Sequence, residues 1–247
     1  MKRHIPNLIT LLNLLSGAIA TVLAVQNNLI TAAAFVGLGI FFDFFDGLAA
    51  RALDVKSEIG LQLDSLADMV TSGLVPGIVM FQLLSKSVDY SFESDALAWS
   101  TQDYLYLDFS WIAIVGFLVT LGSAYRLAKF NIDERQTSSF IGLPTPANAI
   151  LILSFPLILT FQPGELANTL LFNTWFLVGL SIVSCILLNA EIALFALKFK
   201  TYALKPNWFR YLFLLLCAGL IIFLEFWSLP IIILLYIVLS LIVKESE

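Results

Sequence analysis

Residues 41–51 read Phe-Phe-Asp-Phe-Phe-Asp-Gly-Leu-Ala-Ala-Arg, so two carboxylates and an arginine lie within a long apolar segment. An apolar run of about 20 residues is long enough to cross a hydrocarbon core of roughly 30 Å. An ionisable side chain at membrane depth is costly and is retained where an interior partner or water compensates for it. This stretch therefore predicts a membrane helix that carries part of a functional site.

The whole chain has the composition of a membrane protein. Of its 247 residues, 60% are hydrophobic and 13% are charged, which is about half the charged fraction of a typical soluble domain. The net charge of −5 and the absence of a basic block argue against nucleic acid as a partner. We therefore expect an all-α, polytopic transmembrane helical bundle, with residues 1–247 forming one integral membrane domain.

Apolar segments of spanning length predict about eight helices. They are Asn7–Val25, Leu29–Ala52, Gly60–Leu84, Phe109–Leu127, Pro146–Phe161, Leu170–Leu188, Phe209–Trp227 and Pro230–Val243. The short last segment could instead be a tilted or re-entrant partner of the seventh. In this layout, residues 1–190 form a six-helix catalytic core, and residues 191–247 form a cytoplasmic linker and a C-terminal helical hairpin.

The basic residues predict the orientation of these spans. In the eight-span layout, 12 of the 13 lysines and arginines fall on the N-terminal side, and only Lys86 falls on the other side. Because positive charge marks the cytoplasmic side, both termini are expected in the cytoplasm. The acidic loop between Ser85 and Asp108 is then external.

Four aspartates are expected to converge near the cytoplasmic surface. Asp43 and Asp46 are three residues apart in the second span, and Asp64 and Asp68 are four residues apart in the third. Each pair therefore shares one helix face. The connection over residues 52–59 is short enough for an antiparallel helix pair, which would bring all four carboxylates to one depth.

Four clustered carboxylates require neutralising charge, and divalent cations would supply it. Oxygen ligands select Mg²⁺, Mn²⁺ or Ca²⁺, and no histidine or cysteine lies nearby to favour a transition metal. Two ions bridged by aspartates would suit phosphoryl transfer. The residues alone leave open that the aspartates pair with Arg51, that they form a proton path, or that the chain transports divalent cations.

The aspartates and the small residues between them resemble the signature of the CDP-alcohol phosphatidyltransferase family. The matching positions are Asp43-x2-Asp46-Gly47-x2-Ala50-Arg51-x8-Gly60-x3-Asp64-x3-Asp68. The resemblance implies a metal-dependent enzyme that transfers a phosphatidyl group from CDP-diacylglycerol to an alcohol and releases CMP. Its site would open to the cytoplasm, while the acyl chains of the donor stay in membrane lipid.

The resemblance also implies a role for each matching residue. Asp43, Asp46 and Asp64 would be ligands of two divalent ions, either Mg²⁺ or Mn²⁺. Asp68 would take the proton of the attacking hydroxyl as the catalytic base, and it would also contact the second ion. Arg51 would contact the phosphates. Room for the nucleotide and its pyrophosphate would come from the small residues Gly47, Ala50 and Gly60.

Three further segments resemble the prokaryotic phosphatidylserine synthases of this family, which implies serine as the acceptor and the prokaryotic inner (cytoplasmic) membrane as the location. They are residues 6–17 (Pro-Asn-Leu-Ile-Thr-Leu-Leu-Asn-Leu-Leu-Ser-Gly), 123–131 (Ser-Ala-Tyr-Arg-Leu-Ala-Lys-Phe-Asn) and 141–147 (Ile-Gly-Leu-Pro-Thr-Pro-Ala). Lys129 and Tyr125 depart mildly from the subfamily pattern. Glycerol 3-phosphate or an inositol phosphate stays open as an alternative acceptor.

Three polar residues outside the signature are candidate substrate contacts. Arg126 could hold the serine carboxylate bidentately, with Lys129 one turn away on the same face, although both could instead be anchors at the membrane surface. Asn13 could hydrogen-bond the nucleotide or a neighbouring helix.

The Gly73-x3-Gly77 pair predicts close helix packing, within the chain or across a homodimer, and we expect a homodimer.

Overall fold

The computed structural model of the chain describes residues 4–55, 57–88, 110–132, 140–195 and 204–242. Most of the acidic loop between Ser85 and Asp108 lies outside these ranges. So do many of the cations used for orientation: Lys2, Arg3, Lys56, Arg135, Lys198, Lys200 and Lys244. The orientation of the chain therefore stays a prediction.

The expected all-α fold is confirmed. The helices are α1 (Ile5–Val25), α2 (Leu29–Ala52), α3 (Glu58–Asp68), the π-helical η2 (Met69–Leu74), α4 (Val75–Ser87), η3 (Trp111–Phe117), α5 (Leu118–Ile132), α6 (Thr145–Phe161), α7 (Glu165–Leu171), α8 (Thr174–Asn189), α9 (Leu204–Leu224), η4 (Glu225–Trp227) and α10 (Ser228–Ile242). Within the described part, strand pairing is limited to an antiparallel ladder between β1 (Phe140–Ile141) and β2 (Ala193–Leu194).

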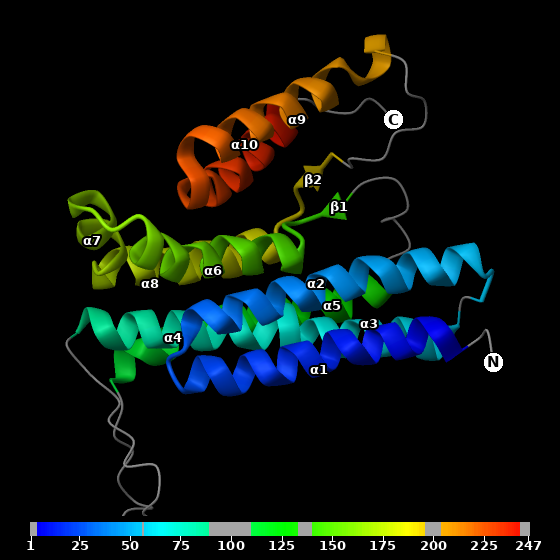
Figure 1. Cartoon of the computed structure of the whole chain (residues 1–247), viewed down its shortest axis with the longest axis horizontal. Helices are drawn as coiled ribbons and strands as arrows, with labels where there is room; N and C mark the ends of the chain where they lie inside the picture. Colours follow the sequence, from blue (N-terminus) through cyan, green and yellow to red (C-terminus); the bar gives the residue numbers. More distant parts are fainter. Residues whose placement is uncertain (1–3, 56, 89–109, 133–139, 196–203, 243–247) are drawn as a thin grey trace, which may run out of the picture.

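The long apolar helices confirm a helical membrane bundle. Among the described residues, five helical stretches are long and apolar enough to cross a membrane, and α7 with α8 makes a sixth if this pair, bent by 65°, is one span. One of the five, Asn207–Ile242, reverses at η4, so α9 and α10 run back along each other (Figure 1). The count of eight spans stays a prediction.

The central element of the bundle is the stretch Glu58–Ser87, which comprises α3, η2 and α4. In the 18-residue apolar part of this stretch, 72% of the residues are buried inside the protein, against 33% in the corresponding part of α1 and 28% in that of α2. Helices α1, α2, α5 and α6 pack around it. Figure 1 shows α1 and α2 side by side, with the end of α2 and the beginnings of α1 and α3 at the same end of the bundle.

Small residues let α5 approach this central stretch closely. A Cβ atom added to Gly77 would overlap the Thr120 hydroxyl, and one added to Gly73 would lie 3.1 Å from the Ser123 Cβ atom. The Thr120 hydroxyl also donates to the Gly73 carbonyl at 3.1 Å. The close packing predicted from Gly73 and Gly77 is therefore confirmed, and it lies within the chain.

We expect Gly77→Ala to destabilise the protein by about 1–3 kcal/mol because the added methyl group overpacks the contact with Thr120. The midpoint of thermal unfolding in detergent measures this loss. Gly179→Ala is the matched control, since a Cβ atom there meets nothing within 4 Å, and alanine is the better helix former. A Gly77→Ala midpoint equal to that of the control would contradict the close contact.

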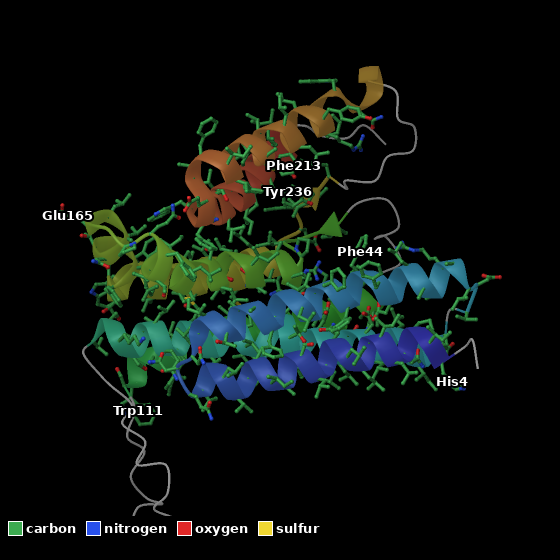
Figure 2. All side chains as sticks on the ribbon, viewed as in Figure 1. His4, Phe44, Trp111, Glu165, Phe213 and Tyr236 are labelled. Atoms are coloured by element: carbon green, nitrogen blue, oxygen red, sulfur yellow. The ribbon has the colours of Figure 1, made fainter. Side chains whose placement is uncertain are left out.

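The expected C-terminal hairpin is formed by α9 and α10, and α10 packs on α6 and β2. The ring centroids of Phe213 in α9 and Tyr236 in α10 lie 6.0 Å apart, on the side of the hairpin that faces β2 (Figure 2). The Tyr236 hydroxyl donates to the Phe195 carbonyl at 2.9 Å. The proposed division between a core and a linker stays a prediction, because residues 196–203 lie outside the described part.

Candidate active site

Three of the four predicted aspartates meet between α2 and α3. One carboxylate oxygen from each of Asp43, Asp46 and Asp64 lies within 4.8 Å of the other two. Asp43 and Asp46 are one turn apart on α2, and the α2–α3 connection is short enough for Asp64 of α3 to return to the same depth and reach them. The helix period and this short connection together produce the predicted convergence.

Asp68 lies one turn beyond Asp64, at the end of α3. It is within electrostatic range of Asp43, Asp46 and Asp64, and its Oδ1 atom accepts a hydrogen bond from Asn13 Nδ2 at 3.3 Å. The π-helical η2 begins at the next residue, and such wide turns occur often at functional sites. We refer to Asp43, Asp46, Asp64 and Asp68 as the aspartate cluster.

The donor set of the aspartate cluster suits a hard divalent cation. Asp46 is only 7% exposed, and among the described residues no lysine or arginine forms an ion pair with any of the four carboxylates. The pairing with Arg51 that the sequence left open is therefore not seen in the described part. A buried carboxylate without an ion-pair partner, such as that of Asp46, is unfavourable without a counter-charge, and closely spaced carboxylate oxygens are the ligands that Mg²⁺ and Mn²⁺ prefer.

A cavity of about 740 Å³ lies beside the aspartate cluster. This volume is in the range of small-molecule binding sites. Its walls come from the ends of α1, α2, α3 and α5, and they include the predicted residues Asp46, Gly47, Ala50, Arg51, Gly60 and Asp64. Every small residue of the signature thus lines the same cavity.

The two glycines of the signature serve this cavity in different ways. A Cβ atom added to Gly47 would meet only Arg51 Nη2, at 4.0 Å, so the missing side chain leaves space open to a ligand. A Cβ atom added to Gly60 would lie 3.1 Å from Ser57 Oγ and 3.3 Å from Asn7 Oδ1. Ser57 caps the N-terminus of α3 by accepting a hydrogen bond from Gly60 N, so Gly60 permits tight packing at this cap.

Arg126 of α5 is buried within electrostatic range of both Asp68 in the aspartate cluster and Tyr236 in the C-terminal hairpin. It is 7% exposed, and its Nε atom has no hydrogen-bond partner among the described residues. Its guanidinium lies 5.9 Å from the ring centroid of Phe130, which lines the cavity, and it is within electrostatic range of Asp68. A buried cation with an unused donor beside the cluster fits an anionic ligand group.

Lys129 has a protein partner instead. Its Nζ atom lies 3.4 Å from Glu191 Oε1, with both side chains partly exposed. Neither Lys129 nor Arg126 lines the cavity. The structure therefore places Arg126 close to the aspartate cluster and turns Lys129 toward the segment that follows α8.

Two residues that the sequence did not single out belong to the site. The Thr10 hydroxyl donates to Asp46 Oδ2 at 2.6 Å, and the Phe130 ring, which contacts the Arg126 guanidinium, lines the cavity. The sequence holds one signal for Thr10: it lies three residues before Asn13 in a mostly apolar helix, so the two polar side chains share a face.

Residues 3–186 match the family model of the CDP-alcohol phosphatidyltransferases, and the chain belongs to this family. The match includes the aspartate cluster, the small residues of the cavity and Arg126. It ends before the C-terminal hairpin.

Particular relatives carry more specific names. The chain is 34% identical over 166 residues to CDP-diacylglycerol–serine O-phosphatidyltransferase of Bacillus subtilis, covering 66% of the chain and 80% of that relative. It is 29% identical over 183 residues to the Methanocaldococcus jannaschii protein of the same name, covering 73% and 71%. It is 29% identical over 154 residues to archaetidylserine synthase of Methanothermobacter thermautotrophicus, covering 61% of the chain and 57% of the relative.

Proposed function

We propose that this protein transfers the phosphatidyl group of CDP-diacylglycerol to the hydroxyl of L-serine and so forms phosphatidylserine and CMP in phospholipid biosynthesis. The observation that carries this function is the aspartate cluster beside a cavity of nucleotide size. Membership of the family supports the transfer chemistry. The names of the relatives support serine as the acceptor.

In the proposed mechanism, Asp43, Asp46 and Asp64 would hold two divalent ions, Mg²⁺ or Mn²⁺, and Asp68 would also contact the second. Bound there, the ions would neutralise the pyrophosphate of the donor and the charge that develops on departing CMP. Gly47 and Ala50 leave space for the nucleotide, and Arg51 contributes positive charge at the rim of the same cavity. The acyl chains of the donor remain in the lipid around the bundle.

Asp68 acts as the general base on the acceptor. Its Oδ1 atom is engaged by Asn13, which leaves Oδ2 to take the proton of the serine hydroxyl. The serine oxygen then forms a bond to the phosphorus that carries diacylglycerol, and the bond from that phosphorus to the bridging oxygen breaks, so CMP leaves with the electron pair. General-base catalysis of this kind contributes about 10²–10⁴-fold to rate.

Arg126 is the proposed partner of the serine carboxylate. We expect Arg126→Ala to raise the KM for serine about 10–100-fold, because a hydrogen-bonded charge contributes roughly 1.5–3 kcal/mol. Arg126→Lys should have a smaller effect, since a point charge replaces a bidentate contact. Steady-state kinetics with serine varied and CDP-diacylglycerol saturating measure both variants.

Lys129→Ala is the control for Arg126, because Lys129 pairs with Glu191 rather than with the aspartate cluster. Its serine KM should stay within a few-fold of the native value. An unchanged serine KM in Arg126→Ala would show that Arg126 does not hold the carboxylate.

A panel of acceptors tests the proposed substrate. Purified protein with CDP-diacylglycerol and Mn²⁺ should release CMP rapidly with L-serine and slowly with ethanolamine, which lacks the carboxylate and leaves Arg126 unpaired. CMP release with glycerol 3-phosphate but not with serine would retain the family chemistry and overturn the acceptor.

The cavity is proposed to open to the cytoplasm of a prokaryote, with the chain in the inner membrane. In a background without Cys185 and Cys217, Asp54→Cys at the α2–α3 turn should be labelled only from the cytoplasm, and Gly164→Cys after α6 only from outside. The opposite labelling would overturn the orientation.

We also propose that the protein forms a homodimer. Light scattering of the purified protein in detergent, which measures its molar mass, tests this proposal.

A further inference from the structure

The buried face of α1 carries two polar side chains that hold carboxylates of the aspartate cluster. Thr10 Oγ1 donates to Asp46 Oδ2 at 2.6 Å, and Asn13 Nδ2 donates to Asp68 Oδ1 at 3.3 Å. Thr10 is 3% exposed and Asn13 is fully buried. Since the two residues are one helical turn apart, one face of α1 contacts both aspartate pairs, one on α2 and the other on α3.

The position of α1 is itself fixed by contacts outside these two hydrogen bonds. The Thr71 hydroxyl, in η2, donates to the Asn13 carbonyl at 3.2 Å. A Cβ atom added to Gly39 of α2 would lie 2.8 Å from Asn13 Oδ1, and one added to Gly17 would overlap Thr71. Glycines at these places let α1 lie directly against α2 and η2.

Asn13 contacts the aspartate cluster and the neighbouring helix α2. Its Nδ2 atom donates to Asp68 Oδ1, and its Oδ1 atom faces Gly39 with no donor among the described residues. Thr10 lies at the edge of the cavity, but its single hydroxyl hydrogen has two protein acceptors, Asp46 Oδ2 and, farther away at 3.1 Å, the Pro6 carbonyl. Each side chain thus donates a hydrogen bond to a carboxylate of the aspartate cluster.

We infer that α1 is the positioning element of the active site, with Thr10 and Asn13 as positioning residues for Asp46 and Asp68. Each hydrogen bond occupies one carboxylate oxygen and so orients the other. The free oxygen of Asp46 is directed toward an ion, and the free oxygen of Asp68 is directed toward the acceptor hydroxyl. The part that concerns Asp68 rests on the proposed function. The part that concerns Asp46 requires only that the cluster binds a divalent cation.

The two hydrogen bonds predict two different defects. Loss of a partner that orients a metal ligand typically weakens metal binding by about 10–100-fold, so Thr10→Val, which keeps the shape and removes the donor, should raise the Mn²⁺ dissociation constant by that factor. Asn13→Leu should lower kcat about 10–100-fold and leave Mn²⁺ binding and the KM for CDP-diacylglycerol within a few-fold of native values.

Conservative and matched variants separate positioning from packing. Thr10→Ser keeps the hydroxyl and should restore Mn²⁺ binding to near the native value. Asn13→Asp keeps the shape but replaces the donor with a carboxylate, so its kcat should fall at least as far as that of Asn13→Leu. Ser16→Ala is the control on the same buried face, because within the described part of the chain the Ser16 hydroxyl bonds only the Leu12 carbonyl of its own helix.

The test measures Mn²⁺ binding to each purified variant by electron paramagnetic resonance and, separately, CMP release with serine and CDP-diacylglycerol varied. Native Mn²⁺ affinity in Thr10→Val overturns the role of Thr10. A raised KM with unchanged kcat in Asn13→Leu makes Asn13 a substrate contact and overturns its positioning role. If either variant fails to fold, Thr10→Ala and Asn13→Ala remove the same donors without adding volume.

The outcome for this inference can be told apart from that for the proposed function. If the native protein binds Mn²⁺ but releases no CMP with any acceptor, the proposed function fails and with it the role of Asn13, whereas the comparison of Thr10→Val with Thr10→Ser still decides the role of Thr10. If the native protein binds no divalent cation, both fail.

Discussion

Asp43→Asn, Asp46→Asn and Asp64→Asn should each lower the rate of CMP release about 10³-fold or more, since metal ions supply several kcal/mol of transition-state stabilisation. The amide keeps the shape of the side chain and removes the charge that binds the ion. Each variant should therefore lose Mn²⁺ binding together with turnover. Initial rates at saturating substrates and direct Mn²⁺ titration measure the two losses.

Asp54→Asn is the control for this series, because Asp54 is exposed at the α2–α3 turn and lies outside the aspartate cluster. Its backbone φ of 50° is one that asparagine adopts readily, so both turnover and Mn²⁺ binding should be native. Full activity in Asp43→Asn would contradict the assignment of the aspartate cluster as a metal site.

Asp68→Asn should reduce kcat about 10²–10⁴-fold, because an amide cannot take the proton of the serine hydroxyl. Its affinity for CDP-diacylglycerol should stay within a few-fold of native, since the base acts on the acceptor and not on the donor. Single-turnover CMP release separates the chemical step from product release, and titration of CDP-diacylglycerol measures its binding.

The pattern of losses in Asp68→Asn decides between two roles. A low kcat with retained donor binding fits a general base. A parallel loss of Mn²⁺ binding, donor affinity and turnover, as in the other three aspartates, would make Asp68 a metal ligand alone and would contradict its role as the base.

The convergence of the aspartates was predictable because it depends on local geometry. The spacing of Asp43 with Asp46 and of Asp64 with Asp68 fixes one helix face for each pair, and the short turn between the helices fixes their depth. The bounds of α2, Leu29–Ala52, agree with the predicted span for the same reason: the apolar run is uninterrupted up to the aspartates. Helix period and chain connectivity were sufficient here.

Other features depend on tertiary packing that sequence spacing does not encode. The partner of Lys129 is Glu191, 62 residues away, and the hydrogen bond from Thr10 to Asp46 depends on the register of α1 against α2. The π-helical turn after Asp68 has no side-chain pattern that marks it. The bend between α7 and α8 did leave a signal, since Asn173 caps α8 by accepting from Phe176 N.

The lipid product of the purified protein tests the central claim most directly. Mass spectrometry and CMP assay would be applied after incubation with CDP-diacylglycerol and L-serine, with Mn²⁺ or with a chelator. We predict phosphatidylserine and CMP in equal amounts when Mn²⁺ is present, and neither product when it is chelated. Phosphatidylserine formed at the full rate in the presence of chelator, or CMP released with Mn²⁺ and serine but without phosphatidylserine, would contradict metal-dependent transfer to serine at the aspartate cluster.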